Sequence, residues 1–175
     1  LYENALMGLI LIEASRCGSV DKFVLVSTTC AYPQNAPLPL TESTLWDGPP
    51  TGATGPYGIA KRTLHSALQS YHEQYGLKSS VILPANLYGP GDHFDPENSH
   101  VVAALLRRYQ EATASNAPQV VNWGTGSPTR EFLHVRDAAR GILTLGAKQS
   151  TPDPTNLGTG LETSIGSLAE MIARC

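Results

Sequence analysis

The sequence predicts an α/β fold in which strands and helices alternate around a mostly parallel sheet. Continuous apolar runs at Phe23–Ser27 and Ser80–Ala85 are typical of strands that are buried on both faces of such a sheet. Between them, Tyr57–Tyr75 carries apolar residues at helical spacing and is followed by Gly76, a common helix stop. This strand, helix and strand order is the repeating unit of parallel α/β proteins.

The rest of the chain continues the alternation. Leu1–Cys17 has the apolar spacing of a helix. Pro33–Pro56 is rich in Pro, Gly and Thr, and a loop of that length within a compact domain is usually functional. The other expected elements are a loop at Tyr88–Ser99, helices at His100–Thr113, at Val135–Lys148 and from Ile165, and strands at Gln119–Trp123 and Thr155–Leu157.

Composition excludes several classes of protein. Apolar residues make up 41% of the 175 residues and charged residues 15%, which is typical of a globular protein. The net charge of −3 gives no electrostatic reason to expect a nucleic-acid partner. The apolar run Ala5–Ala14 is too short to span a membrane. Three cysteines without Cys-x-x-Cys spacing argue against a disulfide framework and favour a cytoplasmic location.

The pair Tyr57 and Lys61 is the first candidate for chemistry. Spacing of i, i+4 places both side chains on one face of a helix. A nearby ammonium stabilises a phenolate and is expected to lower a phenol pKa that is ordinarily about 10. The same spacing is common in amphipathic helices without function, so the pair gains meaning only from its context.

That context is the strand end at Ser27-Thr-Thr-Cys-Ala-Tyr-Pro33. It places hydroxyl groups at the carboxyl end of a buried strand, where open parallel sheets bind their ligands. A hydroxyl, a phenol and an ammonium together can assist hydride transfer at a carbon that bears oxygen.

Here the sequence resembles the extended short-chain dehydrogenase/reductase family, in which a Ser or Thr at a strand end precedes Tyr-x-x-x-Lys. The matching residues are Thr28, Tyr57 and Lys61, followed by Asn86-Leu-Tyr-Gly-Pro90 and Arg130-Glu-Phe-Leu-His-Val-Arg-Asp137. The resemblance covers essentially the whole chain. It implies part of a Rossmann-like, doubly wound parallel sheet at residues 1–87 and a mostly substrate-binding region at residues 88–175, both incomplete.

Within this superfamily the sequence resembles the GDP-L-fucose synthases at Thr29-Cys-Ala-Tyr-Pro33, Asn98-Ser-His-Val101 and Leu105-Leu-Arg-Arg108. This resemblance implies that Cys30 and His100 epimerise C3 and C5 of GDP-4-keto-6-deoxy-mannose, and that NADPH then reduces C4. The alternatives are a GDP-mannose 3,5-epimerase, a UDP-sugar 4-epimerase, or a relative that binds a nucleotide without catalysis.

The resemblance also implies roles for other residues. Arg108, Trp123 and Arg130 would contact the GDP part of the substrate, and a homodimer would form through helices 1–17 and 57–75. We expect no metal site, because His65 and His72 lack a third ligand. The residues expected to contact NADP(H) are Val26, Ser27, Thr28, Thr29, Lys61, Pro84, Ala85, Asn86, Leu87 and His100.

Two departures from the family pattern stand out. Thr28 occupies a position that is usually Ser in fucose synthases, which keeps the hydroxyl and adds a methyl group. No Gly-x-x-Gly-x-x-Gly loop, which would seat the cofactor pyrophosphate, occurs in the chain. We therefore expect the sequence to be an internal piece of a longer protein, and inactive alone.

Overall fold

The computed structural model describes residues 1–175, which form two compact units. The first unit contains residues 1–85 and 138–157, and the second contains residues 86–137 and 158–175. The chain therefore leaves the first unit after β2 and returns to it within α4. Assignment of the units to cofactor and substrate binding stays a prediction.

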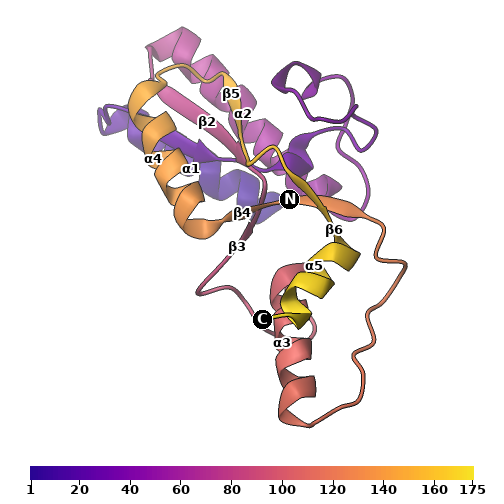
Figure 1. Ribbon diagram of the computed structural model, residues 1–175. Helices are drawn as coiled ribbons and strands as arrows, with labels where there is room; N and C mark the ends of the chain where they lie inside the picture. The colour runs from indigo at the N-terminus through magenta and orange to yellow at the C-terminus, as the bar shows by residue number, and fades with distance from the viewer. The chain divides into compact units, whose positions relative to one another are not determined.

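The first unit is built on a parallel sheet of β1 (Phe23–Val26), β2 (Ser79–Pro84) and β5 (Pro154–Leu157) in the order β1-β2-β5 (Figure 1). Phe23 pairs with Ser79, and Val81 pairs with Pro154. Parallel neighbours require long crossover connections, which α2 supplies between β1 and β2. The parallel α/β prediction is confirmed.

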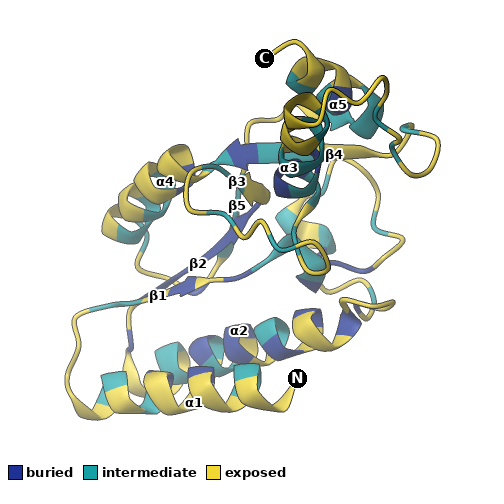
Figure 2. Ribbon diagram, turned by 90° about the horizontal axis from the view of Figure 1, so that it is seen from below, coloured by how far each residue is buried: buried dark blue, intermediate teal, exposed yellow.

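Helices cover both faces of this sheet. Figure 2 shows α1 (Tyr2–Cys17) and α2 (Gly55–Tyr75) on one side, and α4 (Val135–Lys148) on the other. The two helices of the first layer approach closely at Gly8, where a Cβ atom would lie 2.3 Å from Leu64 Cδ1. All three helices were predicted, α1 and α2 from their apolar spacing.

The core of this unit lies between β1, β2 and the α1–α2 layer. It contains Ile12, Leu25, Leu64, Leu68 and Val81, all buried. Burial of these apolar side chains is the main source of stability for the unit.

The two apolar strands differ in burial. Every residue of β2 is buried, as predicted. For β1 the prediction of burial on both faces is wrong, because Val24 and Val26 are 39% and 38% exposed. The reason is position, because β1 lies at the edge of the three-stranded sheet, whereas β2 has a strand on each side.

The second unit has a small mixed sheet and two helices, α3 (Val101–Ala114) and α5 (Ile165–Ala173). The sheet pairs β3 (Asn86–Tyr88) parallel to β4 (Thr129–His134), and β4 antiparallel to β6 (Glu162–Ser164). These three strands were not predicted.

The predicted strand at Gln119–Trp123 is wrong. The segment pairs with no other strand, and Val121 and Trp123 are 66% and 84% exposed. Its main contacts are with α3, where Arg108 donates to the carbonyl oxygen of Val121 and to Asn122 Oδ1, both at 3.3 Å. An apolar, β-branched sequence needs a strand neighbour to form a ladder, and here none is present.

No helix of the structure is long and apolar enough to cross a bilayer.

Candidate active site

The candidate site begins where β1 ends. Thr28 has an extended backbone and caps a single 3₁₀ turn, η1 (Thr29–Ala31), which carries Cys30. The Thr28 side-chain oxygen accepts a hydrogen bond of 3.2 Å from the Cys30 backbone nitrogen. The backbone nitrogen of Ser27 donates to Ile82 in β2 at 2.7 Å. The strand end is therefore fixed, and the hydroxyl hydrogen of Thr28 is available to a ligand.

Tyr57 and Lys61 lie in the first turns of α2, on the same face of the helix. The ammonium of Lys61 lies 5.7 Å from the centre of the Tyr57 ring and donates to the Val26 carbonyl oxygen at 2.8 Å. Partial burial lowers the pKa of Lys61. The pair thus stands beside the last residue of β1, as the motif requires.

The expected effect of Lys61 on the pKa of Tyr57 is wrong in this structure. Burial raises the pKa of Tyr57, and the charge of Cys30, when it is ionised, raises that pKa further. The ammonium of Lys61 is directed to a backbone carbonyl instead of the phenol oxygen. The phenol is protonated at neutral pH with or without this shift, and the shift makes it a weaker acid, so donation of its proton depends on a strongly basic oxygen forming beside it.

Helix α2 and η1 are in direct backbone contact at Gly58. A Cβ atom at this position would lie 2.1 Å from the carbonyl oxygen of Cys30, so only glycine allows the approach. The close contact brings the turn that carries Cys30 against the helix that carries Tyr57 and Lys61.

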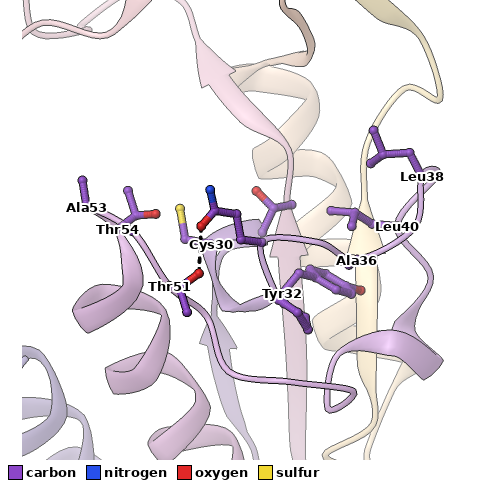
Figure 3. Close-up of a pocket in the computed structure, with 12 residues that line it drawn as sticks. Cys30, Tyr32, Ala36, Leu38, Leu40, Thr51, Ala53 and Thr54 are labelled. Atoms are coloured by element: carbon purple, nitrogen blue, oxygen red, sulfur yellow. Dashed lines mark hydrogen bonds between the residues drawn. The ribbon is translucent and has the colours of Figure 1, made fainter.

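A cavity of about 400 Å³ opens beside this turn (Figure 3). It is lined by Thr29 and Cys30 of η1, by residues of the loop 32–40, and by residues 51–54 before α2. Thr51 Oγ1 donates to Gln34 Oε1 at 2.8 Å and joins the two loops. Cys30 therefore lines a hollow that contains both apolar and hydroxyl groups.

His100 belongs to the second unit, where it is the exposed N-cap residue of α3. The preceding turn is organised by Asp95, whose carboxylate accepts from the backbone nitrogens of Glu97 and Asn98 at 2.9 and 3.0 Å. These hydrogen bonds lower the pKa of Asp95. The imidazole is thus presented by an ordered turn at the start of a helix.

The structure brings together two of the three residues expected to contact GDP. The guanidinium of Arg108 lies 4.9 Å from the centre of the Trp123 ring, and Asn122 donates to Tyr109 Oη at 2.9 Å beside them. Arg130 lies in β4, and its side chain donates to the neighbouring Thr129 carbonyl oxygen at 2.7 Å. A planar cation against an indole ring can bind phosphate and stack a base.

The residues expected at the cofactor lie in both units. Ser27, Pro84 and Ala85 are buried at the ends of β1 and β2, whereas Asn86 and Leu87 are exposed and begin β3. Thr29 lines the cavity described above. No group of three or more His, Cys, Asp or Glu side chains is placed to hold a metal ion.

Sequence reasoning missed Glu131. The carboxylate of Glu131 accepts from the backbone nitrogens of Thr159 and Gly160, the latter at 2.7 Å, and so holds the loop after β5. His134 packs edge-on against Tyr88 with ring centres 5.4 Å apart. The position of Glu131 in the Arg130–Asp137 motif was the available signal.

The chain matches the model of a family described as the NAD dependent epimerase/dehydratase family over residues 1–158. The chain belongs to this family. Membership accounts for the Rossmann-like parallel sheet and for the hydroxyl, phenol and ammonium at its carboxyl edge.

Named relatives within this epimerase/dehydratase family are similar along nearly the whole chain. A probable GDP-L-fucose synthase 1 of Oryza sativa subsp. japonica is 46% identical over 93% of this chain and 50% of its own length. A GDP-L-fucose synthase of Escherichia coli (strain K12) is 41% identical over 99% of this chain and 57% of its own. The chain spans about half the length of the relatives it matches.

Solved structures agree with these relatives. A GDP-L-fucose synthetase from Naegleria fowleri bound to NADP superposes with a TM-score of 0.90 and is 32% identical. The match covers 98% of this chain and 55% of that one.

Proposed function

We propose that the protein containing this chain is a GDP-L-fucose synthase, which converts GDP-4-keto-6-deoxy-D-mannose to GDP-L-fucose by 3,5-epimerisation and NADPH-dependent reduction at C4. One observation carries the proposal: a thiol, Cys30, and a phenol with its ammonium, Tyr57 and Lys61, stand on two backbone segments in contact at Gly58. The similarity to named GDP-L-fucose synthases supports the choice of substrate.

The residues of this chain suit the nicotinamide end of NADP(H). Lys61 is a half-buried ammonium at the carboxyl edge of the sheet, where it can exchange the Val26 carbonyl oxygen for ribose hydroxyl groups. Ser27, Thr29 and the segment Pro84–Leu87 would form the walls of the site. Bound NADPH would supply a hydride to the C4 carbonyl carbon.

Epimerisation is assigned to Cys30 and His100. The 4-keto group acidifies the hydrogens at C3 and C5, and the unperturbed pKa values of a thiol (about 8.5) and an imidazole (about 6.5) suit proton exchange near neutral pH. One residue removes the proton, leaving an enolate, and the other returns a proton to the opposite face of the same carbon. Each inversion therefore neither consumes nor releases a proton overall.

Reduction is assigned to Tyr57, with Thr28 and Lys61 in support. As C4 accepts the hydride, its oxygen takes the proton of the Tyr57 hydroxyl, and the ketone becomes an alcohol. Thr28 would donate a hydrogen bond to the same oxygen, because its own lone pair already accepts from the Cys30 nitrogen. The Tyr57 hydroxyl carries the required proton at neutral pH, because a phenol pKa is ordinarily about 10, and the alkoxide that forms at C4 is basic enough to take it.

Binding of the nucleotide part is assigned to Arg108, Trp123 and Arg130. Arginine forms bidentate hydrogen bonds with phosphate, and Trp123, which already stacks on Arg108, offers a second apolar surface. Trp123 and Arg130 are exposed and Arg108 is half-buried, so a ligand can reach all three side chains.

We also propose a homodimer through α1 and α2, and a cytoplasmic location. The exposed apolar residues Met7, Ile10 and Leu11, which share one face of α1 by their helical spacing, support the dimer, and Ile59 of α2 is also exposed. The cysteine count supports the location.

The proposed function is tested by incubating the full-length protein with GDP-4-keto-6-deoxy-mannose and NADPH. We expect stoichiometric oxidation of NADPH and an L-fucose-configured product. A UDP-sugar 4-epimerase would interconvert its sugars without net consumption of NADPH. Absence of NADPH oxidation with the GDP sugar would contradict the proposed function.

A further inference from the structure

Arg62 links α2 to the turn that carries Cys30. Its Nε donates to the Ala31 carbonyl oxygen at 2.6 Å, and its Nη2 donates to the carbonyl oxygen of Leu45. Ala31 is the residue directly after Cys30, and both Ala31 and Leu45 are buried. The guanidinium therefore satisfies two carbonyl groups that solvent does not reach freely.

The Arg62 guanidinium is also held in position by aromatic residues. Its guanidinium lies 5.2 Å from the centre of the Trp46 ring, and Trp46 packs against the buried His65, with ring centres 5.4 Å apart. His65 Nε2 is in turn 2.8 Å from the carbonyl oxygen of Pro152, which precedes β5. Arg62 is thus connected, through Trp46 and His65, to Pro152 just before β5.

Two rows of side chains run along the first turns of α2. Tyr57 and Lys61 form one row at i, i+4, and Gly58 and Arg62 form the next row, also at i, i+4. Gly58 abuts the carbonyl oxygen of Cys30, and Arg62 holds that of Ala31 one residue later. Gly58 and Arg62 therefore contact the carbonyl groups of two successive residues of η1.

We propose that Arg62 is a positioning residue that holds Cys30 in register with Tyr57, so that α2 serves as one frame for both epimerisation and reduction. Arg62 contacts the backbone of the turn, and it is assigned no contact with substrate or cofactor. This inference rests on the proposed function.

The arrangement predicts unequal effects on the two reactions. Thr28 and Tyr57 are held by β1 and α2. The far end of η1 is held by Arg62 at the Ala31 carbonyl oxygen and by the buried Tyr32, whose hydroxyl donates to Asn156 Oδ1 at 2.9 Å. Without Arg62, the turn keeps its anchors at Thr28 and Tyr32 but loses its side-chain hydrogen bond to α2, so the Cys30 thiol gains freedom relative to Tyr57. Because small misplacements of a reacting group can cost about 100-fold in rate, epimerisation should fall much further than reduction.

The test uses the full-length protein with Arg62→Met and Arg62→Lys. Each variant is incubated with GDP-4-keto-6-deoxy-mannose in D₂O, first without NADPH to measure deuterium uptake at C3 and C5, then with NADPH to measure the ratio of epimerised to unepimerised reduced sugar. We expect Arg62→Met to lower deuterium uptake about 10- to 100-fold while NADPH oxidation falls less than about threefold. Lysine can reach one carbonyl group but lacks the planar fork, so Arg62→Lys should recover part of the uptake.

Arg16→Met is the matched control. Arg16 also stacks on a ring, that of Tyr75 at 4.8 Å, and donates to Glu13, but these partners lie on α1 and at the far end of α2. Its loss should leave the ratio of epimerised to unepimerised product unchanged. Thermal unfolding of every variant identifies any that is not folded at the assay temperature.

The outcomes separate the inference from the proposed function. If the unaltered protein neither exchanges deuterium nor oxidises NADPH, the proposed function fails. If the unaltered protein does both, and folded Arg62→Met loses the two activities in equal proportion or loses neither, the positioning role is refuted.

Discussion

Replacing Tyr57 with Phe in the full-length protein should lower NADPH oxidation by about 10²- to 10⁴-fold, the usual contribution of a positioned general acid. The substitution keeps the ring beside Lys61 and removes only the hydroxyl that would donate the proton. Deuterium uptake at C3 and C5 should persist, because that exchange is assigned to Cys30 and His100. The measurement is the rate of NADPH oxidation with saturating GDP-4-keto-6-deoxy-mannose, alongside NMR of the unreduced sugar.

Tyr75→Phe provides the matched control, since Tyr75 lies at the opposite end of the same helix and is exposed. It should leave both activities unchanged. Near-normal NADPH oxidation by Tyr57→Phe would remove the phenol from the mechanism.

Replacing Cys30 with Ser should strongly slow epimerisation and spare reduction. A hydroxyl group exchanges protons far less readily than a thiol near neutral pH, so we expect deuterium uptake to fall about 10²- to 10⁴-fold. NADPH should still be oxidised, and the product should be the 4-hydroxy sugar with the original configuration at C3 and C5. NMR of the reduced product distinguishes the two configurations.

Cys17→Ser serves as the control for this variant. Cys17 is an exposed thiol at the end of α1, and its replacement should leave the product entirely in the epimerised form. If Cys30→Ser still yields fully epimerised product at the normal rate, the thiol has no part in the proton exchange.

Much of the first unit could be predicted because its signals are local. An uninterrupted apolar run predicts β2, and apolar spacing with a glycine stop predicts α2. The second unit was harder to predict because β3 and β6 have three residues each, too few to show a period. Gln119–Trp123 was wrongly predicted to be a strand because its composition favours one. A strand forms only where a neighbouring strand pairs with it, and the local sequence does not show whether one is present.

The candidate site divides in the same way. The Tyr57–Lys61 pair lies within one helix, so its spacing alone places both side chains on one face. The hydrogen bond from Arg62 to the Ala31 carbonyl oxygen joins residues 31 positions apart in the chain, and no local pattern indicates it. The direction of the Tyr57 pKa shift was also out of reach, because it depends on burial and on where the Lys61 ammonium finds its acceptor.

One incubation tests the central claim most directly: the full-length protein, GDP-4-keto-6-deoxy-mannose and NADPH in D₂O, with the product analysed by NMR. Proton exchange by Cys30 and His100 followed by hydride transfer predicts an L-fucose-configured product with deuterium at C3 and C5 and with protium at C4. Protium retained at C3 and C5 would contradict the epimerisation, and deuterium at C4 would contradict the hydride transfer.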